Sequence, residues 1–403
     1  MVMRVRVPSS LFFFQNGPKL GPRAVDGSIL DGQGHVTAIH VATGRVSELH
    51  IPVPKIRVSL TDICNRRFLW CLLTTMFHLG HIHTGTANTA VLKCDGDILA
   101  VEEGSKPYRL RLDADNALVD GEWLYHRAPI GVHADGDTFT YSPFRNPSLK
   151  VNGLAVDWNP TSFPAMIHSM STPSAKGTAD ACTLRVLPLI STHIGEFWRF
   201  LRGKQRLPLV ERTTLKYLVL NVTTGAAIVV NVLDSGIVSN PLHILKSQVD
   251  AVRNEIEIYA CHVKDFAEVV CTTHNEVLRP TFELRKEVFS LSDGSLLASA
   301  VFPEASGDFP NAINDTLFLV NSLRPETGTT RVVIFDTERD AVIHEVHLPF
   351  DARDVLFYED HLLFCTLDSF CMYDLVQDET VYRVPIPKRD TNFHASLLWV
   401  SGT

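Results

Sequence analysis

The chain of 403 residues lacks several features that would indicate a simple function class. Its longest apolar stretch, at 68–80, is shorter than the about 20 residues that a membrane-spanning helix needs. Lysine and arginine total 37 against 45 acidic residues, and the net charge of −8 argues against nucleic acid, which requires a basic surface. No Gly/Ser-rich or charged linker interrupts the sequence, so we expect residues 1–403 to form a single domain.

The sequence also lacks signs of secretion and of a zinc motif. Its first residues, MVMRVRVPSSLFFF, do not have the pattern of a cleavable leader. None of the eight cysteines forms a CxxC pair, so we interpret them as small buried apolar residues in a reducing compartment. The predicted location is cytoplasmic, and peripheral contact with a membrane stays open. A plastid is the alternative if an N-terminal transit segment is missing.

What the sequence does contain is a series of strand signals. Asp-Gly pairs stand between apolar runs at 95–96, 135–136 and 293–294, and this pair favours a tight hairpin because both central residues need a positive φ. Further strand candidates are LKYLVLNV, AAIVVNVL, EIEIYACHV, DTLFLVNSL, TRVVIFDT, HLLFCTLD and SFCMYDLV. The pattern predicts an all-β protein. Periodicity alone does not distinguish a propeller from a sandwich, although seven blades of roughly 40–50 residues would fit the chain.

Four histidines stand in segments that are far apart in the sequence. They are His133 in GVHADGDTFTYSP, His168 in FPAMIHSM, His243 in NPLHILKSQVD and His394 in DTNFHASLLWV. Imidazole nitrogens suit iron, copper, zinc and nickel. No single helix or hairpin could join these positions, so a shared metal would require a closed fold around a central axis.

The histidine segments resemble the four ligand motifs of the carotenoid cleavage dioxygenases, also called carotenoid oxygenases, most loosely at His243. Further stretches are similar to motifs of that family: QNGP (15–18), LDGQGHV (30–36), GTANTAV (85–91), LAVEEGSKPYRL (99–110) and DFPNAIN (308–314). The resemblance runs from about residue 8 to the C-terminus. Family members begin some tens of residues earlier, so the resemblance implies a shortened N-terminus.

The resemblance implies a seven-bladed β-propeller with a short apolar helical segment and loops that cap one face. It implies one Fe(II) per chain, held by the same four histidines. With O2, this iron would cleave a carbon–carbon double bond of a carotenoid or apocarotenoid and give two carbonyl products. Three alternatives stay open: cleavage of a stilbene, isomerisation and hydrolysis of a retinyl-type ester, and a non-catalytic propeller that binds an apolar ligand.

The resemblance also assigns three carboxylates that would orient the metal-binding histidines. Such partners accept a hydrogen bond from the second ring nitrogen. Glu103 would support His168, Asp308 would support His243, and Asp354 would support His394. The family has glutamate at the last two positions, and aspartate is shorter by one carbon–carbon bond of about 1.5 Å. We therefore expect a direct contact at Glu103 and a longer or water-mediated contact at one or both aspartates.

The apolar stretch NRRFLWCLLTTMFHLG (65–80) has two interpretations. It could be a buried helix or strand pair that closes one face of the propeller. Alternatively, residues 66–80 could touch a membrane surface, with Arg66 and Arg67 at the lipid headgroups.

Outside the four ligand motifs, His35 is expected to be a surface or loop residue.

Overall fold

The computed structural model describes most of the chain. The described residues are 8–19, 32–58, 68–78, 83–102, 105–130, 139–142, 148–156, 162–166, 171–176, 181–193, 215–231, 240–263, 282–324 and 327–400. They are nearly all β-strand, as the sequence predicts. The chain divides into two compact units: unit 1 is Met1–Lys55, Thr84–Arg127 and Asp308–Thr403, and unit 2 is Ile56–His83 and Ala128–Gly307. The prediction that residues 1–403 form one domain stays a prediction.

The described part of unit 1 contains four sheets, in which all strand pairs are antiparallel. The first sheet consists of β1 (Leu11–Gln15), β2 (Pro18–Lys19), β3 (Gln33–His40), β4 (Arg45–His50) and β29 (Ala395–Trp399). The second consists of β5 (Ala90–Cys94), β6 (Asp97–Val101), β7 (Tyr108–Leu112) and β8 (Leu118–Trp123). The third consists of β21 (Asp308–Ala312), β22 (Leu317–Arg324), β23 (Thr329–Asp336) and β24 (Ala341–Leu348). The fourth consists of β25 (Val355–Tyr358), β26 (His361–Cys365), β27 (Ser369–Asp374) and β28 (Glu379–Pro385).

Apolar side chains pack these four sheets face to face. Because successive residues of a strand point to opposite faces, β1 contributes side chains to the apolar cores on both faces of the first sheet. Phe12 and Phe14 pack against the β5–β8 sheet. Phe13 packs against Phe370 of the β25–β28 sheet, with ring centroids 5.0 Å apart. Another cluster joins β25–β28 to β21–β24. The order of packed sheets is therefore second, first, fourth and third.

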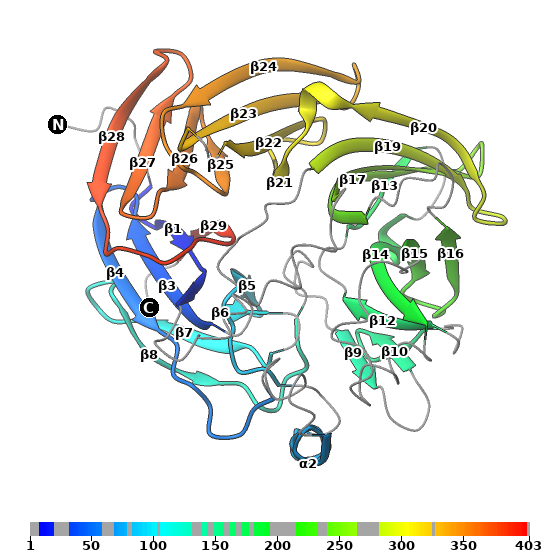
Figure 1. The fold of residues 1–403 in the computed structure, drawn as a ribbon, viewed down its shortest axis with the longest axis horizontal. Coiled ribbons are helices and arrows are strands. Elements are labelled where there is room, and N and C mark those ends of the chain that lie inside the picture. The colour runs from blue at the N-terminus through cyan, green and yellow to red at the C-terminus, as the bar shows by residue number, and fades with distance from the viewer. Residues whose placement is uncertain are drawn as a thin grey trace. The chain divides into compact units, whose positions relative to one another are not determined.

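The first sheet joins the two ends of the described chain. Strand β1 pairs with β29, so that Leu11 lies opposite Trp399 and Gln15 lies opposite Ala395. Figure 1 shows these strands, blue and red, side by side. The pairing places the segment before β29, which carries His394, beside residues that follow β1.

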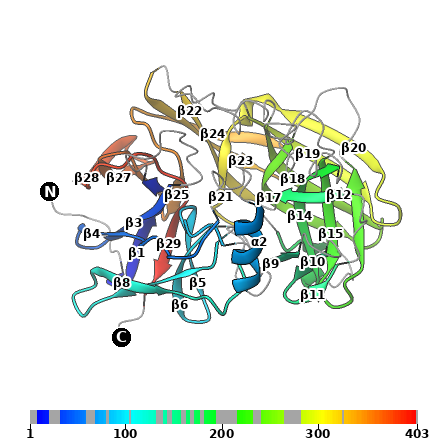
Figure 2. The ribbon, with the colours of Figure 1, turned by 60° about the horizontal axis from the view of Figure 1, so that its bottom comes forward.

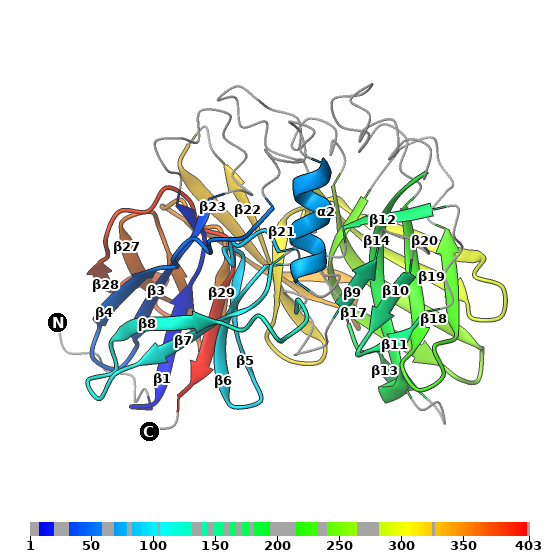
Figure 3. The ribbon, with the colours of Figure 1, turned by 90° about the horizontal axis from the view of Figure 1, so that it is seen from below.

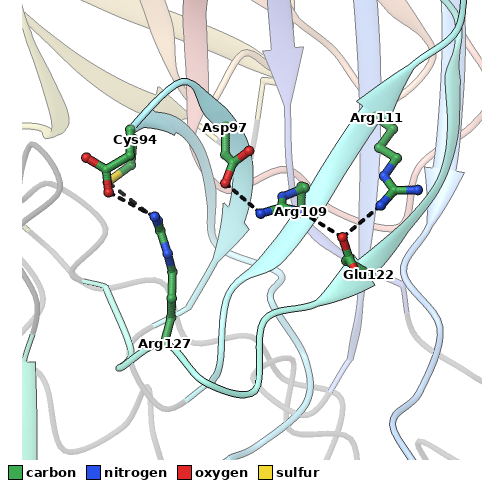
Figure 4. A network of polar contacts seen from close by, with 7 residues as sticks. Cys94, Asp97, Arg109, Arg111, Glu122 and Arg127 are labelled. Carbon is green, nitrogen blue, oxygen red and sulfur yellow. Dashed lines mark hydrogen bonds and ion pairs between the residues drawn. The ribbon is translucent and has the colours of Figure 1, made fainter.

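The β5–β8 sheet contains one of the three predicted Asp-Gly turns; at a second, 293–294, only Gly294 has a positive φ. Asp95 and Gly96 connect β5 to β6 and have φ values of +52° and +85°, the positive values that a type I′ turn requires. On this sheet Arg109 of β7 pairs with Asp97 of β6 at 3.0 Å and with Glu122 of β8 at 2.7 Å (Figure 4). Exposed ion pairs contribute only about 0–1 kcal/mol, so the apolar core supplies most of the stability.

The described part of unit 2 contains three sheets. The first consists of β9 (Phe139–Ser142), β10 (Ser148–Val151) and β11 (Leu154–Ala155). The second consists of β12 (Ser162–Met166), β14 (Leu184–His193), β15 (Leu215–Asn221) and β16 (Ala227–Asn231). The third consists of β13 (Ser174–Lys176), β17 (Asn240–Asp250), β18 (Glu255–Val263), β19 (Phe282–Ser290) and β20 (Leu296–Phe302). The second and third sheets share a core that includes Val219 and Ile258. Figure 2 shows strands of these two sheets, in green and yellow, side by side.

Three further features lie among the described residues of unit 2. Strand β13 pairs parallel with β17, and two 3-10 turns lie at η3 (Ala181–Thr183) and η4 (Pro303–Ala305). Cys261, Cys365 and Cys371 are buried, as expected. Cys182 is exposed and Cys94 is half-buried, so the prediction of burial is wrong for these two residues.

Helix α2 (Phe68–Phe77) is the short apolar helical element that the sequence predicts (Figure 3). Thr74 and His78 are buried, and His78 Nε2 lies 3.1 Å from the Ile56 carbonyl oxygen. The exposed fractions contradict a fully buried helix: Leu69 68%, Trp70 41%, Leu73 52%, Met76 66% and Phe77 63%. Among the residues that the structure describes, no helix has the length and apolar character needed to cross a bilayer.

Candidate metal centre

His394 lies in unit 1, in the connection between β28 and β29, and is 4% exposed. Its backbone is held from two sides. The His394 N–H donates to the Thr89 carbonyl oxygen at 3.1 Å, and the His394 carbonyl oxygen accepts from the Asn16 N–H at 3.1 Å. These bonds join the three segments FHA, QNGP and GTANTAV, so the position of His394 depends on all of them.

A buried carboxylate faces the His394 ring. Asp354, which immediately precedes β25, is 3% exposed, and its Oδ2 atom lies 3.4 Å from His394 Nδ1. This distance exceeds the about 3.2 Å limit of an ordinary N–H···O bond. The same oxygen accepts a hydrogen bond from the Ala395 N–H at 2.7 Å. Asn311 Nδ2 donates to the other carboxylate oxygen at 2.5 Å, so both oxygens of Asp354 are held in place.

Strand β21 contributes an aromatic ring to the same surroundings. Phe309 and His394 pack edge to face, with ring centroids 4.9 Å apart and an angle of 61° between the rings. Phe309 has a φ of +49°, a left-handed conformation that a bulky residue rarely adopts. Its neighbour Asp308 is buried and lies opposite Asn321 of β22. The sequence DFPNAIN therefore supplies both a ring beside His394 and the amide that holds Asp354.

A buried arginine stabilises the connection that carries His394. Arg389 is 1% exposed, and its Nε–H donates to Asn392 Oδ1 at 2.6 Å. Its guanidinium also donates to the His35 carbonyl oxygen at 2.5 Å and to the Thr37 hydroxyl. Burial lowers the pKa of Arg389 to about 10, which still leaves it charged at neutral pH. The sequence analysis did not identify this residue, and its position in a loop gives no periodic signal.

Two asparagines of the resembling motifs have structural roles that the motifs did not reveal. Asn16 Nδ2 donates to the carbonyl oxygens of Ala87 at 3.0 Å and Ala90 at 3.1 Å. Asn88 Nδ2 donates to the Gly32 carbonyl oxygen at 2.7 Å. These side chains satisfy backbone carbonyl groups, and they connect the first sheet to the second.

His243 lies in unit 2, on strand β17, and is 2% exposed. It stands opposite Cys261 of β18, next to a shift in the register of the strand pair. Three other predicted site residues, His133, His168 and Glu103, lie outside the described residues. The convergence of the four histidines and the contact between Asp308 and His243 therefore stay predictions. His35 corrects an expectation: it is a buried residue of strand β3, 3% exposed, and not a surface residue.

Comparison with known proteins gives a likeness of structure. No family model and no curated protein sequence matches the chain. A mutant of the Synechocystis apocarotenoid oxygenase matches with a TM-score of 0.65 and 14% sequence identity, over 96% of this chain and 92% of that chain. An ACO/RPE65 chimera matches with a TM-score of 0.65 and 15% identity, over 97% of this chain and 93% of that chain. The chain therefore has the all-β, propeller-type fold of the carotenoid oxygenases that its motifs predict, while the number of blades stays a prediction.

Proposed function

We propose that this protein is a non-haem Fe(II) dioxygenase that cleaves a carbon–carbon double bond of a carotenoid or apocarotenoid with O2. The observation that carries the proposal is the His394–Asp354 pair in a chain with the fold of an apocarotenoid oxygenase. A buried imidazole whose Nδ1 faces a held carboxylate is the usual arrangement of a metal-ligating histidine.

The described histidines are compatible with iron. His243 and His394 are both buried, and neutral imidazole is a good ligand for Fe(II). In this proposal His133 and His168 complete a set of four ligands, with one iron per chain. The bound iron would supply the activation of O2, and the products would be two carbonyl compounds.

The residues around His394 would orient the ligand. Asp354 would orient the imidazole ring by facing its Nδ1 atom, while Asn311 and the Ala395 N–H hold the carboxylate in place. Phe309 closes one side of the ring with an apolar surface. An apolar lining excludes water and suits a polyene substrate, whose hydrophobic surface gains free energy on leaving water.

We further propose that α2 brings the protein to a membrane surface that holds the apolar substrate. Its exposed residues Leu69, Leu73 and Met76 follow the i, i+4, i+7 spacing of one helix face. A short helix with such a face can lie in the interface of a bilayer. Leu73→Asp should reduce flotation with phospholipid vesicles, whereas Val376→Asp, at an 80% exposed site in unit 1, should not.

The function is tested with the purified chain, reconstituted with Fe(II) without oxygen. We expect O2 uptake when an apocarotenoid is added and two carbonyl products by mass spectrometry. His394→Ala should abolish both signals, while His347→Ala, at an exposed site on β24, should leave them unchanged. Stoichiometric iron with no O2 uptake on any polyene would favour the non-catalytic alternative. Aldehydes cleaved from a stilbene, or a retinol released from a retinyl ester, would identify the other two alternative functions.

A further inference from the structure

A second group of potential metal ligands lies on strands β3 and β4 of unit 1. His35 stands directly opposite His50 in the strand register, and Glu48 precedes His50 by two residues on the same face. Their ligand atoms all lie within 4.8 Å of one another. Residues directly opposite have Cβ atoms about 4.5–5.5 Å apart, so the register itself brings the two imidazoles together.

The three side chains are already in contact. His35 Nε2 lies 2.9 Å from Glu48 Oε2, and the rings of His35 and His50 have centroids 4.2 Å apart. His35 is buried, whereas Glu48 and His50 are exposed. The group therefore combines one fixed ligand with two ligands that can adjust their rotamers and that solvent ions can reach.

The protein holds His35 firmly. The backbone N–H of His35 donates to the Gly17 carbonyl oxygen at 2.8 Å, and the His35 carbonyl oxygen accepts from the Arg389 guanidinium at 2.5 Å. Burial lowers the pKa of His35 to about 4, and burial also lowers the pKa of His50. Both imidazoles are consequently neutral at pH 7, the form that binds metals.

We propose that His35, Glu48 and His50 bind a divalent cation of the zinc class. Two imidazole nitrogens and one carboxylate oxygen form a donor set that zinc accepts in proteins, with a water at the fourth position. Tetrahedral zinc requires ligand atoms about 3.3–3.6 Å apart. Rotation of the exposed Glu48 and His50 side chains would shorten the distances between the ligand atoms, which are at most 4.8 Å, to this range. The ion would join β3 to β4.

Charged neighbours act in both directions. The ammonium of Lys19 lies 3.1 Å from His50 Nε2, and Lys19 and Arg389 both oppose a cation. Glu48 and Asp390 favour one. Lys19 is exposed and lies on the two-residue strand β2, so it can turn away when the ion binds. Lys19→Met should therefore tighten zinc binding by about tenfold, an effect that damage to the fold would not produce.

The test is equilibrium dialysis of the iron-loaded full chain against zinc, with bound metal measured by mass spectrometry. We expect His50→Ala and Glu48→Gln each to bind one zinc fewer than the parent at a concentration that saturates the parent site. Both side chains are exposed, so the variants should fold, which their urea midpoints without zinc will show.

His347→Ala is the matched control. His347 Nε2 forms a 2.8 Å pair with Glu345, also between exposed side chains, and no third ligand is found beside them among the described residues. This variant should retain the parent's zinc. Equal zinc in the parent and in His50→Ala, or weaker binding in Lys19→Met, would overturn the proposal. His394→Ala should keep this zinc whether or not it keeps iron, which separates the two sites.

Discussion

Each unit contains a buried histidine beside a buried carboxylate, and the two carboxylates differ in their hydrogen bonds. In unit 1, Asp354 accepts from the Ala395 N–H and from Asn311 while facing His394. In unit 2, Glu287 of β19 lies 3.7 Å from His262 of β18, and its Oε2 has no hydrogen-bond partner among the described residues. Burial raises the pKa of Glu287 to about 7 and lowers that of His262 well below its ordinary value.

The difference shows how a protein can make one acid–histidine pair suitable for a cation and another unsuitable. Hydrogen bonds to a buried carboxylate stabilise its charged form, whereas desolvation without enough of them favours the neutral form. Asp354 has two donors and can support a positively charged centre through His394. In the Glu287–His262 pair, the buried Tyr217 hydroxyl lies 3.1 Å from His262 Nε2. This pair is better suited to a core in which both groups are uncharged.

The largest expected effect comes from breaking the unit 1 pair. Asp354→Asn keeps the shape of the side chain but removes its charge, so the His394 ring loses its orienting partner. We expect iron affinity to fall about 10–100-fold. The measurement is iron retained after dialysis against graded chelator. Asp120→Asn, at an exposed site on β8, should bind iron as the parent does. Unchanged affinity in Asp354→Asn would mean that Asp354 is only structural.

A smaller effect is expected when Asp354 keeps its charge but loses a donor. Asn311→Ala frees one carboxylate oxygen, and we expect iron affinity to fall by about tenfold, the lower end of the range for partners of metal ligands. Asn314→Ala is the control, because Asn314 accepts hydrogen bonds in a turn after the same strand without touching Asp354. If both variants lose iron equally, the loss reflects stability and not the orientation of His394.

The unit 2 pair should give a pH effect on stability. The folded-state pKa of Glu287 is about 7, above the ordinary value of 4.5, so the folded state binds its proton more tightly. This stabilisation is complete below pH 4.5 and is lost as the pH rises through 7. Between pH 6 and 8.5 the parent should lose about 1 kcal/mol of unfolding free energy that Glu287→Gln retains. Urea unfolding at both pH values measures it, with the exposed Glu379→Gln as control. An identical loss in both variants would contradict the assignment.

The smallest expected effect sharpens the unit 1 pair. Asp354→Glu should shorten the 3.4 Å distance to His394 Nδ1, and we expect iron to bind about threefold more tightly. Chelator competition measures the change, and Asp308→Glu provides the corresponding test on β21. Weaker binding in Asp354→Glu would show that the present hydrogen bonds to Asn311 and Ala395 are worth more than a closer ring.

Local sequence predicted the strands well because local geometry specifies them. The Asp95-Gly96 pair predicted a turn with two positive φ values, and the apolar run EIEIYACHV forms β18 as Glu255–Val263. The short apolar helix was also predicted. Its exposure was left open between a buried and a membrane-contacting segment, because the apolar pattern of α2 shows one face without showing what covers it.

The sequence by itself determined the all-β character, the hairpins and the histidine segments, since these depend on alternation, turn residues and short motifs. Only the tertiary structure decided that β29 pairs with β1, that Arg389 is buried against His35 and Thr37, and that Asn311 holds the Asp354 carboxylate. These contacts join residues far apart in the chain. Forming them costs chain entropy, and only the packing of the sheets offsets that cost. A local pattern in the sequence therefore does not predict them.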